Sequence, residues 1–257
     1  IASYGDIYGQ TIQYKNLPKD LINAVIVTED KRFFSHIGVD LKGIIRATYV
    51  NLKARKIVQG GSTITQQLAK NLFLTPERSF TRKLHELILS FWLEMRFTKQ
   101  QILSIYLNRV YLGSGTYGVQ AASEKYFNKK VEELNLYESA LIASLLKAPS
   151  KYNPISNEKL SRVRTSKVLE NMAKNKLITF SNVKEAKLSN KNYDKFTSAP
   201  KSTRYFIDWL LPRVKTYLGE INEDLIVRTT LDVQLQEIAE KSVNQITSKY
   251  ESADQSA

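Results

Sequence analysis

The sequence contains no cysteine and only two histidines, His36 and His85. Without cysteine there is neither a disulfide nor a thiolate metal site, and two histidines are too few for a histidine-rich metal centre. No apolar run approaches the roughly 18 to 20 residues that a membrane-spanning helix needs. Ile1 is neither a start methionine nor part of a signal peptide, so we expect the chain to be a piece of a longer protein.

Acidic residues are also scarce, above all between positions 42 and 83, where nine lysines and arginines accompany the single acid Glu77. The whole chain has a net charge of +13 and a pI near 9.6. This excess predicts a polyanionic partner, such as nucleic acid, an anionic membrane surface or a phosphorylated substrate. With 257 residues, 42% of them hydrophobic, the chain is long enough for one large or two small globular domains.

Apolar residues recur at helical spacing through most of the first 180 residues. The expected helices cover residues 21–29, 40–56, 82–96, 119–126, 136–146 and 162–172, and a Thr98–Gln101 capping-box pattern opens a further one. Segment 40–56 is basic and amphipathic, which suits either a solvated surface or a membrane surface. In segment 82–96 we expect one apolar stripe to be buried, formed by Leu84, Leu87, Ile88, Phe91 and Met95.

The last third of the chain has a different composition. Residues 184–203 are rich in Lys, Asn and Ser, which is typical of a mobile connection, and we place a domain boundary between residues 180 and 181. Residues 225–231 alternate like a short strand, Asp232 is expected to cap a helix, and residues 250–257 form a polar tail. The predicted fold class is mainly α, with a short α/β segment at the C-terminus.

Residues 60–71, GGSTITQQLAKN, have the most unusual local composition. The two glycines allow the backbone to pass close to a ligand, and Ser62 and Thr63 are good N-cap residues for a helix that starts near Ile64. Gln66 and Gln67 then precede Lys70 by four and three residues, so they lie on neighbouring positions of one surface. The segment predicts a polar helix face that attracts anions.

Glu29 and Asp30 follow an apolar helical run and precede Phe33, Phe34 and His36. Adjacent acids are most often solvated surface residues. A carboxylate flanked by aromatic side chains at a helix end can instead be partly desolvated, which raises its pKa toward the range of a general base. Both interpretations remain open from this pair alone.

A further acid, Glu86, follows Arg82 by four residues and Lys83 by three. The simplest interpretation is an ion pair on a helix surface, worth a fraction of a kcal/mol. Together with Lys70 and Arg78, however, this cluster contains more cations than one glutamate neutralises. The surplus would suit a pyrophosphate.

Five segments of the chain occur in an order and at distances that resemble one known family. They are EDKRFFSHIG (29–38), GGSTITQQLAKN (60–71), RKLHE (82–86), ILSIYLN (102–108) and RTSKVL (164–169). With these motifs, residues 1–178 resemble the peptidoglycan glycosyltransferase domain of glycosyltransferase family 51, found in class A penicillin-binding proteins and monofunctional transglycosylases. The resemblance implies a mainly α-helical, lysozyme-like fold with a larger lobe, a smaller membrane-contacting lobe and a cleft between them.

The resemblance also implies roles for individual residues. Glu29 matches the catalytic base, and Glu86 matches a second carboxylate of the catalytic site. The matching substrate-binding residues are Asp30, Phe33, His36, Ser62, Thr63, Gln67, Lys70, Asn71, Arg78, Arg82 and Lys83. Of these, Arg78, Arg82 and Lys83 are the expected diphosphate ligands. No cofactor is required, although some members use a divalent cation, Mg²⁺ or Mn²⁺, which Glu86 could bridge to diphosphate.

The implied reaction polymerises lipid II into β-1,4-linked glycan. Glu29 would take a proton from the acceptor's C4 hydroxyl, which attacks the donor's anomeric carbon with inversion and releases undecaprenyl diphosphate. The implied partners are lipid II, the growing glycan strand, the outer leaflet of the bacterial cytoplasmic membrane and a transpeptidase domain of the same protein, with no nucleic acid. The expected location is the extracytoplasmic face of that membrane, with an anchoring helix before Ile1.

Several patterns favour other functions. GSGTYG (113–118) fits GxGxxG, but no βαβ succession surrounds it, and two SxxK matches at Ser144 and Ser181 have no following KTG. The alternative enzyme is a lysozyme-like hydrolase or lytic transglycosylase, which also uses a glutamate but gives the cations no role. A non-enzymatic nucleic-acid binder would explain the net charge, yet no recognised nucleic-acid-binding motif accompanies it.

Overall fold

The computed structural model describes residues 7–56, 60–75, 79–189, 206, 209–210, 213–214, 216–217 and 227–254. Its contacts divide the chain into a larger unit, Tyr4–Phe196, and a smaller unit that combines Ile1–Ser3 with Thr197–Ala257. The boundary predicted at 180/181 stays a prediction. Helix α10 (Phe180–Ser189), which begins at that boundary, packs on the preceding helix of the larger unit.

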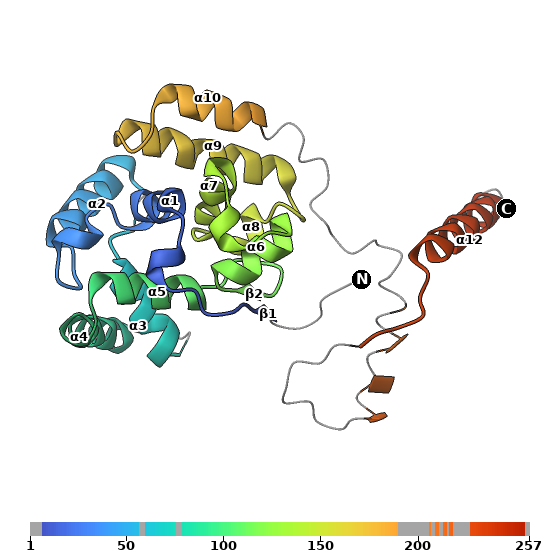
Figure 1. The fold of residues 1–257 in the computed structure, drawn as a ribbon, viewed down its shortest axis with the longest axis horizontal. Helices are drawn as coiled ribbons and strands as arrows, with labels where there is room; N and C mark the ends of the chain where they lie inside the picture. Colours follow the sequence, from blue (N-terminus) through green and yellow to red (C-terminus); the bar gives the residue numbers. More distant parts are fainter. Residues whose placement is uncertain are drawn as a thin grey trace. The chain divides into compact units, whose positions relative to one another are not determined.

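The larger unit is almost entirely helical, as predicted for the fold class (Figure 1). Its other elements are β1 (Ile7–Tyr8), η1 (Tyr14–Asn16), α1 (Lys19–Glu29), η2 (Phe33–Ser35), α2 (Leu41–Ala54), α3 (Ile64–Phe73), α4 (Phe80–Arg96), α5 (Lys99–Arg109), β2 (Thr116–Tyr117), α6 (Val119–Phe127), η3 (Val131–Glu133), α7 (Leu136–Leu145), α8 (Pro149–Tyr152) and α9 (Glu158–Lys174). The strands β1 and β2 pair in parallel over two residues each. The six helices expected from apolar periodicity are all present.

Helix α7 forms the centre of one group of helices in the larger unit. Every residue from Tyr137 to Leu145 is buried, and α7 packs against both α1 and α9. A helix that is buried on all sides belongs to the core, and its alanines and serines allow neighbouring helices to approach closely. Ser144, which begins one SxxK match, is fully buried in α7 and is therefore inaccessible to a substrate.

A second group of helices contains α3, which packs against α4 and α5. In Figure 1, α2 and α4 lie on the opposite side of the larger unit from α6 and α8. The last residue of α1, in the α7 group, is hydrogen-bonded to α3, in the second group. The boundary between the two groups is therefore where Glu29 lies.

Short polar side chains fix the starts of the helices around this boundary. Thr63 caps α3 and forms a reciprocal capping box with Gln66, as Thr98 and Gln101 do at α5. Asp40 caps α2 by accepting a hydrogen bond from the Gly43 amide at 2.7 Å. The N-caps predicted around Thr63 and Thr98 are confirmed.

The apolar stripe expected to be buried on residues 82–96 lies on the outer face of α4 instead. Four of its five members are exposed by 41 to 76%: Leu84, Ile88, Phe91 and Met95. The inward side of α4 carries Glu86, Ser90 and Leu93. The expected burial was wrong because periodicity identifies an apolar face without identifying what covers it.

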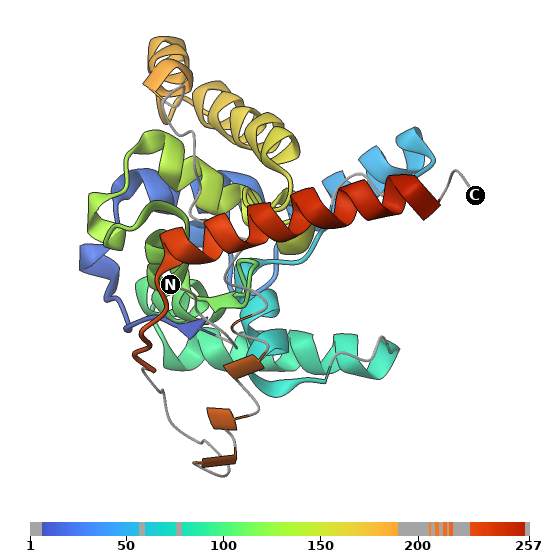
Figure 2. The same cartoon turned by 90° about the vertical axis from the view of Figure 1, so that its right-hand side faces the viewer.

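Helix α2 likewise exposes large apolar residues, with Leu41, Ile45, Tyr49 and Leu52 at least 66% exposed. Both helices lie on the left side of the larger unit in Figure 1, and α2 lies above α4 in Figure 2. We call these exposed residues of α2 and α4 the apolar edge. None of the helices in the described part of the chain combines the length and apolar character needed to cross a bilayer.

The smaller unit contains one long helix, α12 (Val233–Asp254). Asp232 caps it, as predicted, by accepting hydrogen bonds from the amides of Gln234 and Leu235. The helix extends through residues 250–254 of the predicted polar tail. Of the strand predicted over residues 225–231, residues 227–231 are not a strand, and residues 225–226 lie outside the described residues. Residues 184–189 belong to α10, so the predicted mobile connection does not begin there, and residues 190–203 lie outside the described residues.

Candidate active site

Glu29 is the C-terminal residue of α1 and is half-buried. Its Oε2 accepts a hydrogen bond of 3.0 Å from Nε2 of Gln67 on α3. Burial raises the pKa of Glu29 above its ordinary value of 4.5, against the hydrogen bond from Gln67 and the positive charges of Arg164 and Lys147, which lower the pKa. The carboxylate is therefore partly desolvated, as its aromatic surroundings in the sequence suggested.

Tyr106 extends this contact into α5. Its hydroxyl donates a hydrogen bond of 3.1 Å to Oε1 of Gln67, the same amide that donates to Glu29. Burial raises the pKa of the Tyr106 phenol well above 10, and the nearby charge of Glu29 raises it further. Tyr106 belongs to the ILSIYLN segment but was not singled out from the sequence.

Asp30 supports the loop beside Glu29. Its carboxylate is buried and accepts hydrogen bonds from Nε2 of His36, at 2.9 Å to Oδ2, and from the Ile64 amide at 3.1 Å. Phe33 is fully buried and lies beneath the ammonium group of Lys99, 4.5 Å from the ring centroid. The substrate-binding roles implied for Asp30, Phe33 and His36 stay predictions, and the geometry supports a role in positioning the start of α3.

Replacing Asp30 with alanine is expected to destabilise the protein by about 1–3 kcal/mol, because the buried Ile64 amide and His36 would lose their acceptor. Urea denaturation measures the change. Glu132→Ala is the matched control, since Glu132 is an exposed acid and its removal should change the unfolding free energy by less than about 0.5 kcal/mol. Equal stability of the two variants would contradict the supporting role of Asp30.

The GGST segment connects the start of α3 to the loop before α2 and to α4. Thr63 is buried and donates a hydrogen bond of 2.6 Å to the carbonyl oxygen of Gly38. Gly38 has a φ of +75°, and a Cβ there would lie 3.1 Å from the backbone of Ser90 on α4, so this close approach requires glycine. Ser62 accepts a hydrogen bond of 2.9 Å from Nζ of Lys83.

Glu86 is buried on α4 and holds two cations. Its Oε1 lies 2.9 Å from Nη1 of Arg82, and its Oε2 lies 2.6 Å from Nζ of Lys83. Of the predicted cations, Arg82 and Lys83 are therefore oriented by a shared carboxylate that neutralises only one of them. Arg78 lies outside the described residues.

The contacts of Glu86 test whether it is free to bind the divalent cation that the family resemblance implies. Both oxygens of Glu86 are occupied by nitrogen donors, and the described residues hold no group of three or more His, Cys, Asp or Glu side chains able to ligate a metal ion. Among the described residues, Glu86 therefore has no neighbouring set of ligands that would complete a metal site.

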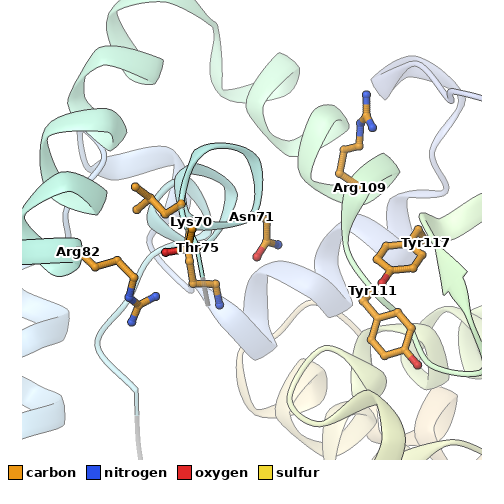
Figure 3. A pocket seen from close by; sticks show the side chains of 8 residues that line it. Lys70, Asn71, Thr75, Arg82, Arg109, Tyr111 and Tyr117 are labelled. Atoms are coloured by element: carbon orange, nitrogen blue, oxygen red, sulfur yellow. The ribbon is translucent and has the colours of Figure 1, made fainter. Parts of the chain in front are cut away.

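A pocket of about 580 Å³ lies beside the polar face of α3. Figure 3 shows Lys70 and Arg82 on one side of it and Arg109, Tyr111 and Tyr117 on the other. The pocket is lined by Lys70, Asn71, Leu74, Thr75, Arg82, Arg109, Tyr111 and Tyr117. Lys70, Asn71 and Arg82 were predicted from the sequence, whereas the other lining residues were not.

Tyr117 of the GSGTYG segment and the nearby Tyr111 line the far side of this pocket. Tyr111 and Tyr117 form an isolated bridge, and their ring centroids lie 5.0 Å apart. Gly118 has a φ of +85°, and a Cβ there would lie 2.6 Å from the carbonyl oxygen of Asn108. Gly113, Gly115 and Gly118 all have positive φ and form a turn after α5. In a nucleotide-binding loop the GxGxxG segment would instead follow a strand of a βαβ unit.

Helix α3 connects the pocket to the carboxylate. Gln67, which touches Glu29, precedes Lys70 and Asn71 by three and four residues, so all three lie on one face of α3. The spacing along the helix axis is only about 4.5–6 Å. The arrangement places the Glu29 carboxylate next to a pocket lined by the cations Lys70, Arg82 and Arg109.

Known proteins resemble this chain over most of its length. A family model described as Transglycosylase matches residues 1–173. Penicillin-binding protein 1A of Aquifex aeolicus (strain VF5) is 44% identical over 241 residues, which are 91% of this chain and 32% of that protein. The Neisseria flavescens protein of the same name is 37% identical over 254 residues, 98% of this chain and 32% of that protein.

The fold has a similar counterpart among solved structures. The crystal structure of penicillin-binding protein 1A from Haemophilus influenzae matches with a TM-score of 0.50 and 25% identity, over 86% of this chain and 23% of that one. The chain spans about a third of the length of the two relatives above. It belongs to the Transglycosylase family, the peptidoglycan glycosyltransferases of the class A penicillin-binding proteins.

Proposed function

We propose that this chain polymerises lipid II into β-1,4-linked glycan, with Glu29 as the general base. One observation carries the proposal: the polar face of α3 touches a carboxylate of raised pKa at Gln67 and lines a cationic pocket at Lys70 and Asn71. A transfer reaction with a diphosphate leaving group needs these two features side by side.

In the proposed reaction, Glu29 accepts the proton of the C4 hydroxyl on the acceptor's N-acetylglucosamine. The oxygen attacks the anomeric carbon of the donor's N-acetylmuramic acid, and the bond from that carbon to the diphosphate oxygen breaks. Direct displacement converts the α-linked donor into a β-1,4 product. The leaving diphosphate gains negative charge next to Lys70 and Arg82, where it is stabilised electrostatically.

Lipid II supplied as the only substrate tests this proposal against glycan cleavage. Growth of a glycan polymer with release of undecaprenyl diphosphate is the expected result. A chain that leaves lipid II unchanged and shortens finished glycan would instead be a hydrolase or lytic transglycosylase, and the proposal would fail. Salt-sensitive DNA binding without glycan synthesis would favour the nucleic-acid binder.

We also propose that the chain acts at the outer face of the bacterial cytoplasmic membrane, as part of a longer protein with an anchoring helix and a transpeptidase domain. The relatives are about three times as long as this chain, which supports further domains. The apolar edge supports contact with lipid, because exposed apolar patches rimmed by basic residues bind membrane surfaces.

Replacing Ile45, Leu52, Leu84 and Ile88 together with serine is expected to weaken binding to anionic liposomes at least about tenfold. All four side chains are more than half exposed, so the fold should tolerate the change. Liposome flotation measures binding. Val163→Ser, which removes an apolar side chain 68% exposed on α9, is the control, and equal flotation of both variants would refute the lipid contact.

A further inference from the structure

Three helices meet at the candidate base through one chain of hydrogen bonds. The Tyr106 hydroxyl on α5 donates to Oε1 of Gln67 on α3 at 3.1 Å, and Nε2 of Gln67 donates to Oε2 of Glu29 on α1 at 3.0 Å. Tyr106 is 1% exposed. The side chain is therefore almost entirely shielded from bulk water, and Gln67 is the hydrogen-bond partner of its hydroxyl among the described residues.

The chemistry of the three groups fixes the direction of this chain. A phenol that stays protonated offers its hydrogen to the amide oxygen, which leaves the amide NH₂ facing Glu29. With the amide reversed, its carbonyl oxygen would face the Glu29 carboxylate, and two acceptors would repel each other. Tyr106 and Glu29 thus favour the same orientation of Gln67 from its two sides.

This orientation has a consequence for the carboxylate. Oε2 of Glu29 is held by Gln67, whereas no described residue hydrogen-bonds to Oε1. An oxygen without a protein partner is available to accept a proton from substrate. Because the hydrogen bond to Oε2 fixes the rotation of the carboxylate, it also fixes where Oε1 lies.

We infer that Tyr106 is a positioning residue for the general base, acting through the amide of Gln67 to hold Glu29 with one oxygen free. The inference rests on the proposed function, since it assigns Tyr106 a part in the same proton transfer. It also gives Gln67 a defined task, orienting Glu29, in addition to the substrate contact implied by the family resemblance.

The alternative is that Tyr106 only fills the core. Its ring belongs to the hydrophobic cluster of the larger unit, together with Leu103 and Leu107. Phenylalanine would preserve this packing and remove only the hydroxyl. Tyr106→Phe therefore separates the two roles, because a packing role predicts almost no effect on catalysis.

The charged surroundings of Glu29 determine what the pH profile should report. Arg164 on α9 and Lys147 after α7 favour its ionised form, Asp30 disfavours that form, and Gln67 on α3 favours it by hydrogen bonding. Loss of a well-oriented Gln67 donor would remove one of the favourable contributions. The acid limb of kcat/KM should therefore move to higher pH in Tyr106→Phe.

The test compares Tyr106→Phe with Tyr126→Phe in the lipid II polymerisation assay. Tyr126 is 3% exposed, and its hydroxyl donates at 2.9 Å to the Leu112 carbonyl oxygen, so it is a matched buried tyrosine. We expect Tyr106→Phe to lower kcat about five- to tenfold with KM within about twofold and to raise the acid-limb pKa. Tyr126→Phe should leave the acid-limb pKa where it is, and both variants should lose similar thermal stability.

A double-mutant cycle shows whether Tyr106 acts through Gln67. In a Gln67→Ala background, Tyr106→Phe should have no further effect on kcat. Equal effects of Tyr106→Phe in both backgrounds, or a pH profile like that of Tyr126→Phe, would overturn the inference. Failure of the wild-type chain to polymerise lipid II would overturn the proposed function instead.

Discussion

Replacing Glu29 with glutamine is expected to lower kcat for polymerisation by about 10²- to 10⁴-fold, the contribution typical of general base catalysis. The amide cannot accept the acceptor's proton, although it retains the size of the carboxylate and can accept the hydrogen bond from Gln67. Initial rates of glycan synthesis from lipid II measure the change. A Glu29→Gln variant that polymerises at the wild-type rate would eliminate Glu29 as the base.

The same variant should also change stability, in the opposite direction from activity. Burial raises the pKa of Glu29 in the folded state, so ionisation above the ordinary pKa of 4.5 opposes folding. Below pH 4.5 the two proteins should be similarly stable, and as pH rises through the folded-state pKa, Glu29→Gln should become the more stable. Thermal denaturation at pH 4 and pH 7 checks the sign. Wild-type activity should rise over this same pH range, because the base must be ionised.

Much of the local structure followed from the sequence because it depends on nearby residues. The capping boxes at Thr63 and Thr98 each need a partner only three residues away, so their pattern predicts their geometry. The contact of Glu86 with Arg82 and Lys83 is also local, since residues three and four apart on a helix are neighbours.

The apolar face of α4 shows where local patterns stop being informative. Periodicity locates Leu84, Ile88 and Phe91 on one side of the helix, and that part of the prediction holds. Whether such a face is covered by protein depends on the packing of the whole lobe. The inward side of α4 carries the acid Glu86. Its carboxylate can be buried there because Arg82 and Lys83 pair with it and compensate for its lost hydration.

The candidate site includes residues that only the tertiary structure brings together. Tyr106 approaches Gln67 across 39 positions of sequence, and Lys147 and Arg164 approach Glu29 from elements much later in the chain. Tyr106, Lys147 and Arg164 each occur in a segment whose apolar or basic pattern gives no indication of a contact with Glu29 or Gln67. Arg109 and Tyr111 had one available signal, their position directly after the ILSIYLN segment.

Replacing Lys70 with methionine is expected to lower kcat by about 10²- to 10³-fold, the usual effect of removing one charge-stabilising donor from a reaction centre. Lys70 is exposed at the pocket, and none of the described residues neutralises its ammonium group. Arg82, by contrast, already shares its charge with Glu86. Arg109 also lines the pocket without an acid partner among the described residues, but Lys70 lies on the face of α3 that carries Gln67. We therefore expect Lys70 to respond to the charge that grows on the leaving diphosphate.

Lys130→Met provides the control for this substitution. Lys130 is an exposed lysine before η3, so the change removes the same charge without touching the pocket. If Lys70 acts on the leaving group, its loss should reduce kcat more than it raises KM, because the interaction strengthens only as the bond breaks. If both variants show the same small loss, which added salt abolishes, the net charge of the protein would explain the effect and Lys70 would have no specific role.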